Sequence, residues 1–470
     1  MNLSDITIAG ARASLDAKEF SARELTDTYL YEIEKKDKDI HAYLEVWGKE
    51  ARMEADAADA TIARGESKPL TGIPLAIKDN ILIHGRVASA ASKILENYVA
   101  SYDATVIQKL KKQGAVFLGR TNMDEFALGS STENSAYGPT KNPHDLERVP
   151  GGTSGGSAAA VAARMALAAL GSDTGGSIRQ PAAFCGIAGL KPTYGEVSRS
   201  GLMAAASSLD QIGTLGKSVA DARILFEAIR GHDDLDSTSL PDSLLTRVKP
   251  KKIGVPRKFL EKGVDADVLT AFEETLTRLR ERGYEIVDIE LPSLPYSLAV
   301  YYIINPAEVS TNLARYDGIR YGVRADAATI GEVYEKSRSY GFGPETRRRI
   351  LVGTFVLSSG YADAYYRKAR AVREVLRADF ASVFNTVDAI AVPTTPTPAF
   401  KLGENTSDPL AMYAEDIFTV PINLAGVPAI SVPMGGVNRE GYDLPLGFQL
   451  IAPHRGEATL FAIGSDVEKA

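Results

Sequence analysis

The sequence is poor in the residue types that most often build metal centres and covalent cross-links. Among its 470 residues there is one cysteine, Cys185, and only five histidines, which are scattered. A single cysteine excludes an internal disulfide and any metal site built from several thiolates. We therefore expect no metal site. Because Cys185 lies in the apolar stretch AAFCGIAGL, we predict that its thiol is buried as a small hydrophobic group.

Positive charge and long apolar runs are also lacking. The net charge is -7 at pH 7, so the chain as a whole does not attract a polyanion such as tRNA. No apolar run reaches the roughly 20 residues that span a membrane, and the N-terminal sequence lacks the features of a signal peptide. We expect a cytoplasmic protein with no membrane contact. Its 44% hydrophobic and 24% charged residues are typical of a globular protein with a large core.

Alternating helical and strand patterns predict an α/β protein. Ser21 and Glu24 have the spacing of a capping box ahead of a 3.6-period apolar stripe, which predicts a helix. Short apolar runs typical of buried strands follow at intervals. They are IPLAIKDNILI, AVFLG, Leu167 to Leu170, KKIGVP, YEIVDIEL, DAIAVP, AISVPM and LGFQLIA. We predict one domain with a large mixed, mainly parallel β-sheet covered by helices on both faces, a helical N-terminal segment over about 1–65 and a helical elaboration over about 306–380.

Two glycine-dense loops, PGGTSGGS at 150–157 and GSDTGGSIRQP at 171–181, are the strongest local signals. Small residues let the backbone approach a ligand closely. Neither loop has the G-K-[ST] ending of a P-loop or the G-x-G-x-x-G of a dinucleotide fold, so nucleotide binding is poorly supported.

The first loop also contains the G-x-S-x-G pattern of the α/β-hydrolase nucleophile elbow, with Ser154 at its centre and His454 as a conceivable base. That motif requires a strand directly before the serine. The preceding KNPHDLERVPGG is polar and contains proline, which argues against the elbow.

Lys78 and Ser177 offer a different route to a nucleophile. A serine hydroxyl is weakly nucleophilic unless a base takes its proton, and a lysine can be that base when burial lowers its pKa toward working pH. Lys78 lies between apolar LAI and DNILI, which favours burial. Taken alone, Lys78 is more typical of a solvated lysine at a strand end, and Ser177 of a helix N-cap before IRQP.

Lys78 and the two loops together resemble the amidase signature family. The matching blocks are IPLAIKDN, PGGTSGGSAAAVAA and GSDTGGSIRQPAAFCGIAGLKPTYG. The resemblance implies the amidase signature fold with a catalytic core over about 66–225. It also implies a relay of a lysine, a serine held by a cis peptide bond and a nucleophilic serine, which falls on Lys78, Thr153 and Ser177. The N–H groups of Thr174, Gly175 and Gly176 would then form an oxyanion hole.

Position 153 departs from the family pattern, because the family serine is Thr153 here. Threonine keeps the hydroxyl but adds a methyl group at a crowded site. We expect the relay to operate at a reduced rate, with the neighbouring Ser154 as a minor substitute. A catalytically impaired structural subunit is the alternative that this departure raises.

Blocks outside the catalytic core resemble the A-type chains of the glutamyl- and aspartyl-tRNA amidotransferase family. They are GRTNMDEFALGSSTENSAYGPTKNP, NLARYDGIRYG, RRRILVGTFVLSSGYADAYYRKA and INLAGVPAISVPMG. The resemblance implies a glutaminase whose ammonia converts Glu-tRNA(Gln) or Asp-tRNA(Asn), with subunits B and C as partners. The partner subunit would use ATP and magnesium and hold most of the tRNA, so this chain would need no cofactor. A stand-alone amidase is the enzyme alternative.

Glutamine carries an α-carboxylate and an α-ammonium, so its pocket should present a cation, preferably an arginine, and an anion. The resemblance places these groups on Arg349 and Asp416, with Tyr301 as a hydroxyl partner and Gly129 and Ser130 lining the glutamine side.

Two of these assignments have open alternatives. Arg349 belongs to a run of three arginines, which is typical of a solvated face, and Tyr302 could take the place of Tyr301.

Overall fold

The computed structural model describes residues 6–245, 248–406 and 408–469. Its α-helices are α1 (Ile8–Asp16), α2 (Ala22–Ile40), α3 (Gly48–Ala63), α4 (Thr105–Gln113), α5 (Gly155–Ala162), α6 (Arg179–Cys185), α7 (Val219–Ile229), α8 (Arg257–Leu260), α9 (Ala266–Glu281), α10 (Ser297–Asn312), α11 (Ile330–Gly341), α12 (Pro344–Leu357), α13 (Lys368–Val383), α14 (Pro409–Ala414), α15 (Val420–Ala425) and α16 (Glu457–Glu468). Short helical turns are η1 (Lys93–Leu95), η2 (Glu125–Ala127), η3 (Leu294–Tyr296), η4 (Leu313–Arg315) and the π-helical η5 (Asp363–Arg367). Its strands are β1 (Tyr43–Val46), β2 (Pro74–Lys78), β3 (Val116–Thr121), β4 (Ala168–Asp173), β5 (Ala188–Lys191), β6 (Gln211–Gly216), β7 (Lys252–Val255), β8 (Glu285–Asp288), β9 (Ala389–Pro393), β10 (Ala429–Arg439) and β11 (Tyr442–Ile451).

The predicted capping box at the start of α2 is confirmed. The Ser21 side chain accepts from the Glu24 N–H, and the Glu24 carboxylate accepts in return from the Ser21 N–H. Two of the backbone donors left over at a helix start are thereby satisfied. The apolar stripe of the same helix, which includes Leu25, Tyr29 and Ile33, is buried, so one face of α2 packs into the core.

All the strands in the described parts of the chain form a single 11-stranded sheet in the order β1-β3-β2-β4-β6-β5-β10-β11-β9-β7-β8. The prediction of a large mixed sheet is confirmed, but the prediction that it is mainly parallel is wrong. Six of its ten neighbouring pairs are antiparallel and four are parallel. Apolar runs reveal where buried strands lie but carry no information on their direction, which is set by the connections.

Three strands, β1, β5 and β6, were absent from the predicted set. Their sequences are YLEV, AGLK and QIGTLG, which are short or rich in small residues. Strands β5 and β6 pair with each other and join β4 to β10 in the middle of the sheet, always antiparallel. These missed strands account for much of the error in the predicted strand direction.

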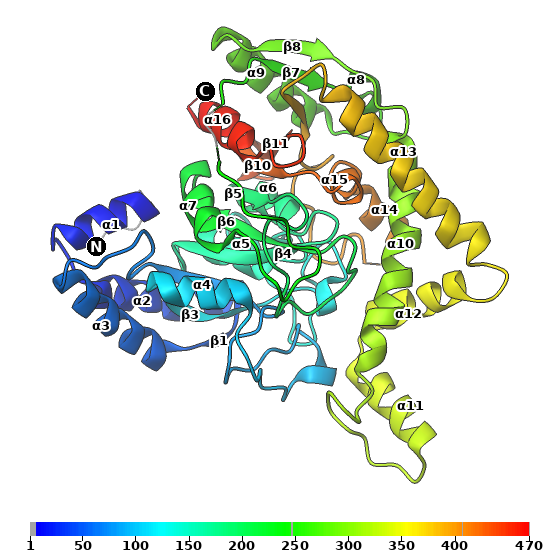
Figure 1. The fold of residues 1–470 in the computed structure, drawn as a ribbon, viewed down its shortest axis with the longest axis horizontal. Helices are drawn as coiled ribbons and strands as arrows, with labels where there is room; N and C mark the ends of the chain where they lie inside the picture. Colours follow the sequence, from blue (N-terminus) through cyan, green and yellow to red (C-terminus); the bar gives the residue numbers. More distant parts are fainter. Residues whose placement is uncertain (1–5, 246–247, 407, 470) are drawn as a thin grey trace.

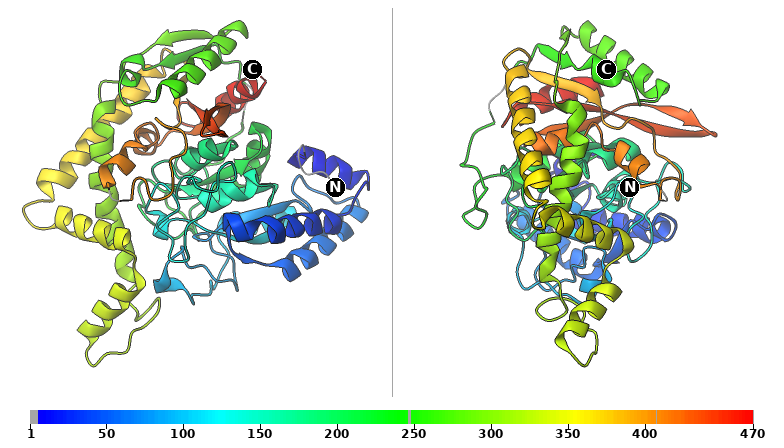
Figure 2. Two further views of the ribbon diagram at one scale, coloured as in Figure 1. Left: turned by 180° about the vertical axis from the view of Figure 1, so that it is seen from behind. Right: turned by 90° about the vertical axis from the view of Figure 1, so that its right-hand side faces the viewer.

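Helices cover both faces of the sheet, as predicted. Every residue of β2, β4, β5, β6 and β9 is buried, which requires cover on both sides. Helices α5 and α6 pack against each other and on the central strands, while α7 and α16 form a second group with α9. Figures 1 and 2 show the strands extending from the side of α1, α2 and α3 through the middle of the molecule to β7 and β8 at its opposite edge.

The predicted helical elaboration is an arm along the side opposite the N-terminal helices, coloured yellow-green to yellow in Figure 1. It consists of α10, α11, α12 and α13 and therefore begins and ends a few residues outside the predicted range of 306–380. Helix α12 packs against α10. Helices α10 and α13 in turn pack against α15, which joins the arm to the rest of the molecule.

Cys185 is buried, as predicted, and its thiol lies 3.4 Å from the Pro150 carbonyl oxygen. Burial raises the pKa of this thiol far above its ordinary value. Among the described residues, no helix is long and apolar enough to cross a membrane.

Candidate active site

Lys78 is the last residue of β2, and its side chain is fully buried. Its ammonium donates to Thr153 Oγ1 at 2.6 Å, to Ser154 Oγ at 2.8 Å and to the Ser172 carbonyl at 3.3 Å. Burial lowers the pKa of Lys78 to about 7, although several surrounding carboxylates act in the opposite direction. A solvated lysine at a strand end is therefore excluded, and this amine can be neutral near pH 7.

Thr153 meets Lys78 from the first glycine-dense loop. The Gly152–Thr153 peptide bond is cis, as the resemblance implied, and the Thr153 side chain is buried. The neighbouring Ser154 is hydrogen bonded to Lys78 and to Ser172, and no strand ends before it. The α/β-hydrolase elbow is therefore not formed here.

Ser177 lies in the turn between β4 and α6, and 7% of its surface is exposed. Its hydroxyl has no hydrogen-bond partner among the described residues. Its carbonyl accepts from the Ser154 N–H at 3.1 Å, which holds the two glycine-dense loops together. Helix α6 begins at Arg179 with Ile178 as its N-cap, so the interpretation of Ser177 as a helix cap is wrong.

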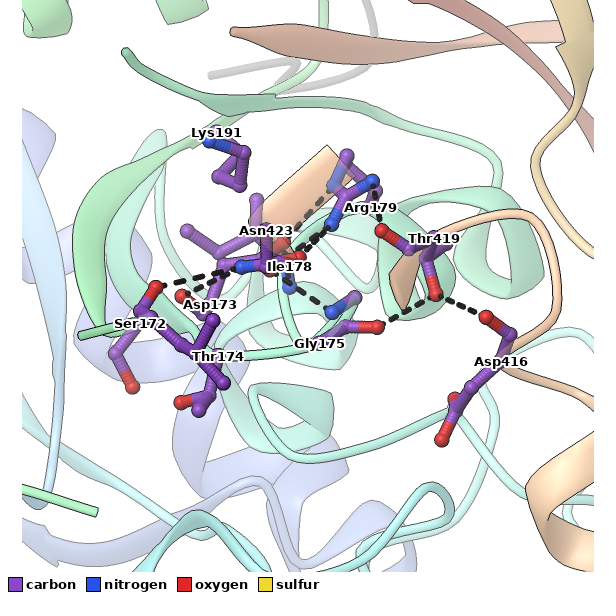
Figure 3. Close-up of polar contacts among 12 residues, drawn as sticks. Ser172, Asp173, Thr174, Gly175, Ile178, Arg179, Lys191, Asp416, Thr419 and Asn423 are labelled. Atoms are coloured by element: carbon purple, nitrogen blue, oxygen red, sulfur yellow. Dashed lines mark hydrogen bonds and ion pairs between the residues drawn. The ribbon is translucent and has the colours of Figure 1, made fainter. Parts of the chain in front are cut away.

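The turn that carries Ser177 is built around a buried ion pair between Asp173 and Arg179 (Figure 3). Burial acts to raise the pKa of Asp173, but the Arg179 guanidinium outweighs it and holds that pKa at about 2. The Asp173 carboxylate also accepts from the N–H groups of Gly176 at 2.8 Å and Ile178 at 3.2 Å. This carboxylate fixes the backbone on both sides of Ser177.

The prediction that Gly176 contributes to an oxyanion hole is not supported by this geometry, because its N–H already donates to Asp173. The N–H groups of Thr174, Gly175 and Ser177 donate to no described residue. These three are the backbone donors that remain available at the turn. The Thr174 hydroxyl, in contrast, is engaged by the buried carboxylate of Asp210 at 2.7 Å.

The outer side of the turn leaves no room for larger residues. Gly176 has a φ of +139°, a conformation that favours glycine, and a Cβ there would lie 2.3 Å from Thr419 Oγ1. A Cβ on Gly175 would lie 2.5 Å from the hydroxyl oxygen of Tyr301. Thr419 also donates to the Gly175 carbonyl at 2.6 Å (Figure 3), so the two glycines let α10 and the 415–419 segment approach the turn closely.

Asp416 lies on the same segment as Thr419 and has two hydroxyl partners. Its Oδ2 accepts from Ser130 at 2.9 Å and from Tyr302 at 3.0 Å. Burial raises the pKa of Asp416 to about 7. The structure therefore brings the predicted Ser130 and Asp416 together, and it makes Tyr302, the alternative to Tyr301, the tyrosine that contacts Asp416.

Arg349 is 4% exposed, so the interpretation of its arginine run as a solvated face is wrong at this position. The guanidinium donates to Glu345 at 2.7 Å and to Asn305 at 3.1 Å, and it lies 5.4 Å from the ring centre of Tyr302. Tyr302 thus contacts both charged residues predicted for the pocket.

Tyr301 and Gly129, also predicted for the substrate site, make the following contacts. The Tyr301 hydroxyl accepts from Asn305 at 3.3 Å, and its ring stands edge-on to that of Tyr302. A Cβ on Gly129 would lie 2.4 Å from the carboxyl carbon of Asp124. Gly129 is therefore needed for close packing against Asp124.

The residues that organise this site without having been predicted are buried polar groups from distant segments. Asp173 and Arg179 lie in the second glycine-dense loop, where two opposite charges among small residues could have indicated a buried ion pair. Asn305 and Thr419 are single polar residues in apolar surroundings and gave no signal. In the described parts of the chain, no cluster of histidine, cysteine or carboxylate side chains could hold a metal ion.

The family model described as Amidase matches residues 24–461. The chain therefore belongs to the amidase family. Within this family, it is similar over its whole length to proteins named as the A chain of glutamyl-tRNA(Gln) amidotransferase. One from Desulfatibacillum aliphaticivorans is 52% identical and aligns over 100% of this chain and 98% of its own length.

Two crystal structures extend the comparison. The A chain of glutamyl-tRNA(Gln) amidotransferase from Thermotoga maritima has a TM-score of 0.82 at 42% identity, covering 100% of this chain and 95% of its own. The native peptide amidase from Stenotrophomonas maltophilia has a TM-score of 0.80 at 29% identity, covering 99% and 97%. One fold thus accommodates proteins named for different activities.

Proposed function

We propose that this chain is the glutaminase subunit of a tRNA-dependent amidotransferase. It hydrolyses the side-chain amide of glutamine and delivers ammonia to a partner subunit for conversion of Glu-tRNA(Gln), or Asp-tRNA(Asn), in an ATP-dependent reaction. Its full-length similarity to A chains of glutamyl-tRNA(Gln) amidotransferase supports this role. Subunits of the B and C type are the partners, tRNA is held mainly by the partner, and the partner uses ATP and magnesium.

The observation that carries the proposal is the 2.6 Å contact between the buried Lys78 amine and the Thr153 hydroxyl. Thr153 lies in the loop whose Ser154 N–H donates to the Ser177 carbonyl at 3.1 Å. With a pKa of about 7, Lys78 is partly neutral at physiological pH. Neutral Lys78 accepts the Thr153 proton while Thr153 accepts the proton of Ser177, whose oxygen attacks the amide carbon. The amide C–N bond then breaks to leave an acyl-enzyme on Ser177, and the proton taken up by Lys78 returns through Thr153 to the leaving nitrogen, which departs as ammonia. Water attacks this acyl-enzyme, releases glutamate and restores the Ser177 hydroxyl.

Negative charge develops on the amide oxygen during attack. The free N–H groups of Thr174, Gly175 and Ser177 are the donors we assign to it, in a site from which burial excludes most water. Loss of one such donor costs about 3 to 4 kcal/mol in a well-studied case. Asp173 supports this function because it holds the turn by its flanking N–H groups.

The charged groups beside the turn suit a free amino acid. Arg349 presents a guanidinium for the α-carboxylate, and Asp416 presents a carboxylate for the α-ammonium. Ser130 and Tyr302 orient Asp416. A simple amide without these two charges would make neither of these charged interactions, which disfavours its binding relative to glutamine.

The test is to produce the chain together with B and C type subunits and to measure glutamine-dependent conversion of Glu-tRNA(Gln). Wild type should be active, Ser177→Ala inactive with glutamine, and both should use free ammonia equally, because the ammonia-dependent step lies on the partner. Retention of glutamine-dependent turnover by Ser177→Ala would refute the assigned nucleophile. Hydrolysis of simple amides without partners would favour a stand-alone amidase, and the absence of turnover in wild type would favour a structural subunit.

A further inference from the structure

Asn305 is a buried polar residue that joins two parts of the site. It lies in the middle of α10 and is 1% exposed. Its Oδ1 accepts from Arg349 Nη1 at 3.1 Å, and its Nδ2 donates to the Tyr301 hydroxyl at 3.3 Å. A buried amide is retained at low cost only where such hydrogen bonds satisfy it. Asn305 thus connects Arg349, which lies on α12, to Tyr301, which lies against the turn that carries Ser177.

The contacts of Arg349 determine which edge of its guanidinium is free. Glu345 takes the Nε–H at 2.7 Å, and Asn305 takes one hydrogen of Nη1. Nη2 has no partner among the described residues. The Nη2 side of the guanidinium is therefore the edge without a described partner, and a guanidinium binds a carboxylate through such N–H groups. Asn305 is the neutral partner in this arrangement.

The second contact of Asn305 leads toward the reacting centre. Tyr301 lies close to Gly175, because a Cβ added to Gly175 would lie 2.5 Å from the hydroxyl oxygen of Tyr301. Gly175 is one of the residues whose N–H remains available beside Ser177. An uninterrupted series of contacts therefore runs from Arg349 through Asn305 and Tyr301 to the nucleophile turn.

We propose that Asn305 is a positioning residue that orients the free edge of Arg349 toward the α-carboxylate of glutamine and connects it to the nucleophile turn through Tyr301. The inference rests on the proposed function. The neutrality of Asn305 matters, because Glu345 already places one carboxylate on Arg349, and a second anion at position 305 would make the group net negative and repel the substrate carboxylate.

Asn305→Asp is the decisive substitution, because it keeps the size of the side chain and replaces the amide by a carboxylate. We expect it to weaken glutamine binding roughly tenfold to hundredfold, the range for one lost interaction with a charged group, while kcat changes by less than about threefold. The dissociation constant is measured by calorimetry on Ser177→Ala with and without Asn305→Asp, and KM and kcat on the active complexes. Asn305→Leu should show a smaller loss of affinity, because it removes the hydrogen bonds without adding charge.

Glutaminamide, in which the α-carboxylate is replaced by a neutral amide, separates positioning from general disruption. Asn305→Asp should not weaken its binding further, whereas a merely structural defect would weaken both ligands equally. The proposal for Asn305 would be overturned if Asn305→Asp weakened the binding of both ligands equally or left glutamine affinity unchanged. It would also be overturned if Ser177→Ala bound no glutamine. Turnover of glutamine by the wild-type complex is scored separately, so failure of the proposed function is recognised independently of these binding results.

Discussion

Thr153 shows how much of the chemistry depends on a single hydroxyl. Its Oγ1 lies 2.6 Å from the Lys78 amine, and its side chain is fully buried. The extra methyl group of threonine has therefore been accommodated without displacing the hydroxyl from the lysine. The contact between Lys78 and Thr153 that the proposed relay requires is therefore formed, while its step from Ser177 to Thr153 remains a prediction.

We predict that Thr153→Val abolishes most glutaminase activity, whereas Thr153→Ser retains it. Valine has nearly the shape of threonine but no hydroxyl, so it interrupts the proton path, and a lost acid–base step costs roughly 10²- to 10⁴-fold. Glutamine-dependent ammonia release by the assembled complex measures both variants. Activity of Thr153→Val within about threefold of wild type would show that the proton takes another path, for which Ser154 is the candidate.

The pH profile should report the Lys78 amine. Because burial lowers its pKa to about 7, the amine is neutral and active above that pH and protonated below it. We expect kcat to fall about tenfold per pH unit below 7 and to level off above it. Asp416, with a pKa raised to about 7, must also be ionised in the free enzyme, so kcat/KM should fall more steeply than kcat.

Ammonia release measured between about pH 5.5 and 9 gives both profiles, with ammonia-driven conversion as the control for the partner subunit. Asp416→Asn should reduce the steepness of kcat/KM and leave the shape of the kcat profile unchanged. A kcat that is constant from about pH 6 to 8 would rule out Lys78 as the base.

At the scale of elements, Arg349 and Tyr302 lie on helices, α12 and α10, that must be held against the core. The buried Glu125 at the start of η2 does this for α12. It accepts from the Gly343 N–H at 2.8 Å and from the hydroxyls of Ser92 and Thr346. These contacts tie the first turn of α12 to the core, one turn before Arg349.

We predict that Glu125→Gln lowers the free energy of unfolding by about 1 to 3 kcal/mol, because the amide cannot accept from all three donors. KM for glutamine should rise while the response to ammonia is unchanged, since α12 carries Arg349. Denaturant unfolding and glutamine kinetics measure the two effects. Glu345→Gln serves as the comparison, because it changes the ion-pair partner of Arg349 and leaves the contacts of Glu125 intact. It should raise KM for glutamine with less effect on the free energy of unfolding.

At the scale of the whole molecule, Arg179 connects the two halves of the chain. Its fully buried guanidinium pairs with Asp173 and donates to the Thr419 carbonyl and to the side chains of Asn423 and Gln449. These partners are separated from it by as many as 270 residues in sequence. The sheet is continuous across both halves, and this arginine holds the catalytic turn at their junction.

We predict that Arg179→Leu destabilises the protein by about 3 to 5 kcal/mol, because it leaves the Asp173 carboxylate buried and unpaired. Chemical denaturation followed by circular dichroism measures the change. The control is Arg223→Leu, which removes an exposed pair with Glu227 and should change stability by less than about 1 kcal/mol. Equal effects of the two substitutions would contradict the assigned role of the buried pair.

The sequence by itself determined the parts that depend on local pattern. Helix α2 with its capping box and the strands with apolar runs were predictable, because a short motif or a period of apolar residues specifies each one. The family resemblance indicated Lys78, Thr153 and Ser177 as relay residues, and the structure brings Lys78 and Thr153 into contact. The similarity of the outer blocks likewise indicated Arg349 and Asp416 as pocket residues. Their positions in the structure agree with a common site, while their roles remain predictions.

Only the tertiary structure decided what depends on contacts between distant segments. The direction of the strands follows from connections that apolar runs do not encode, so the sheet is not mainly parallel. The N–H of Gly176 is taken by Asp173, and Tyr302 rather than Tyr301 contacts Asp416, because hydrogen bonds form between atoms that packing brings within about 3 Å. For the same reason Asn305 acquires its place between Arg349 and Tyr301 only when α10 and α12 pack together.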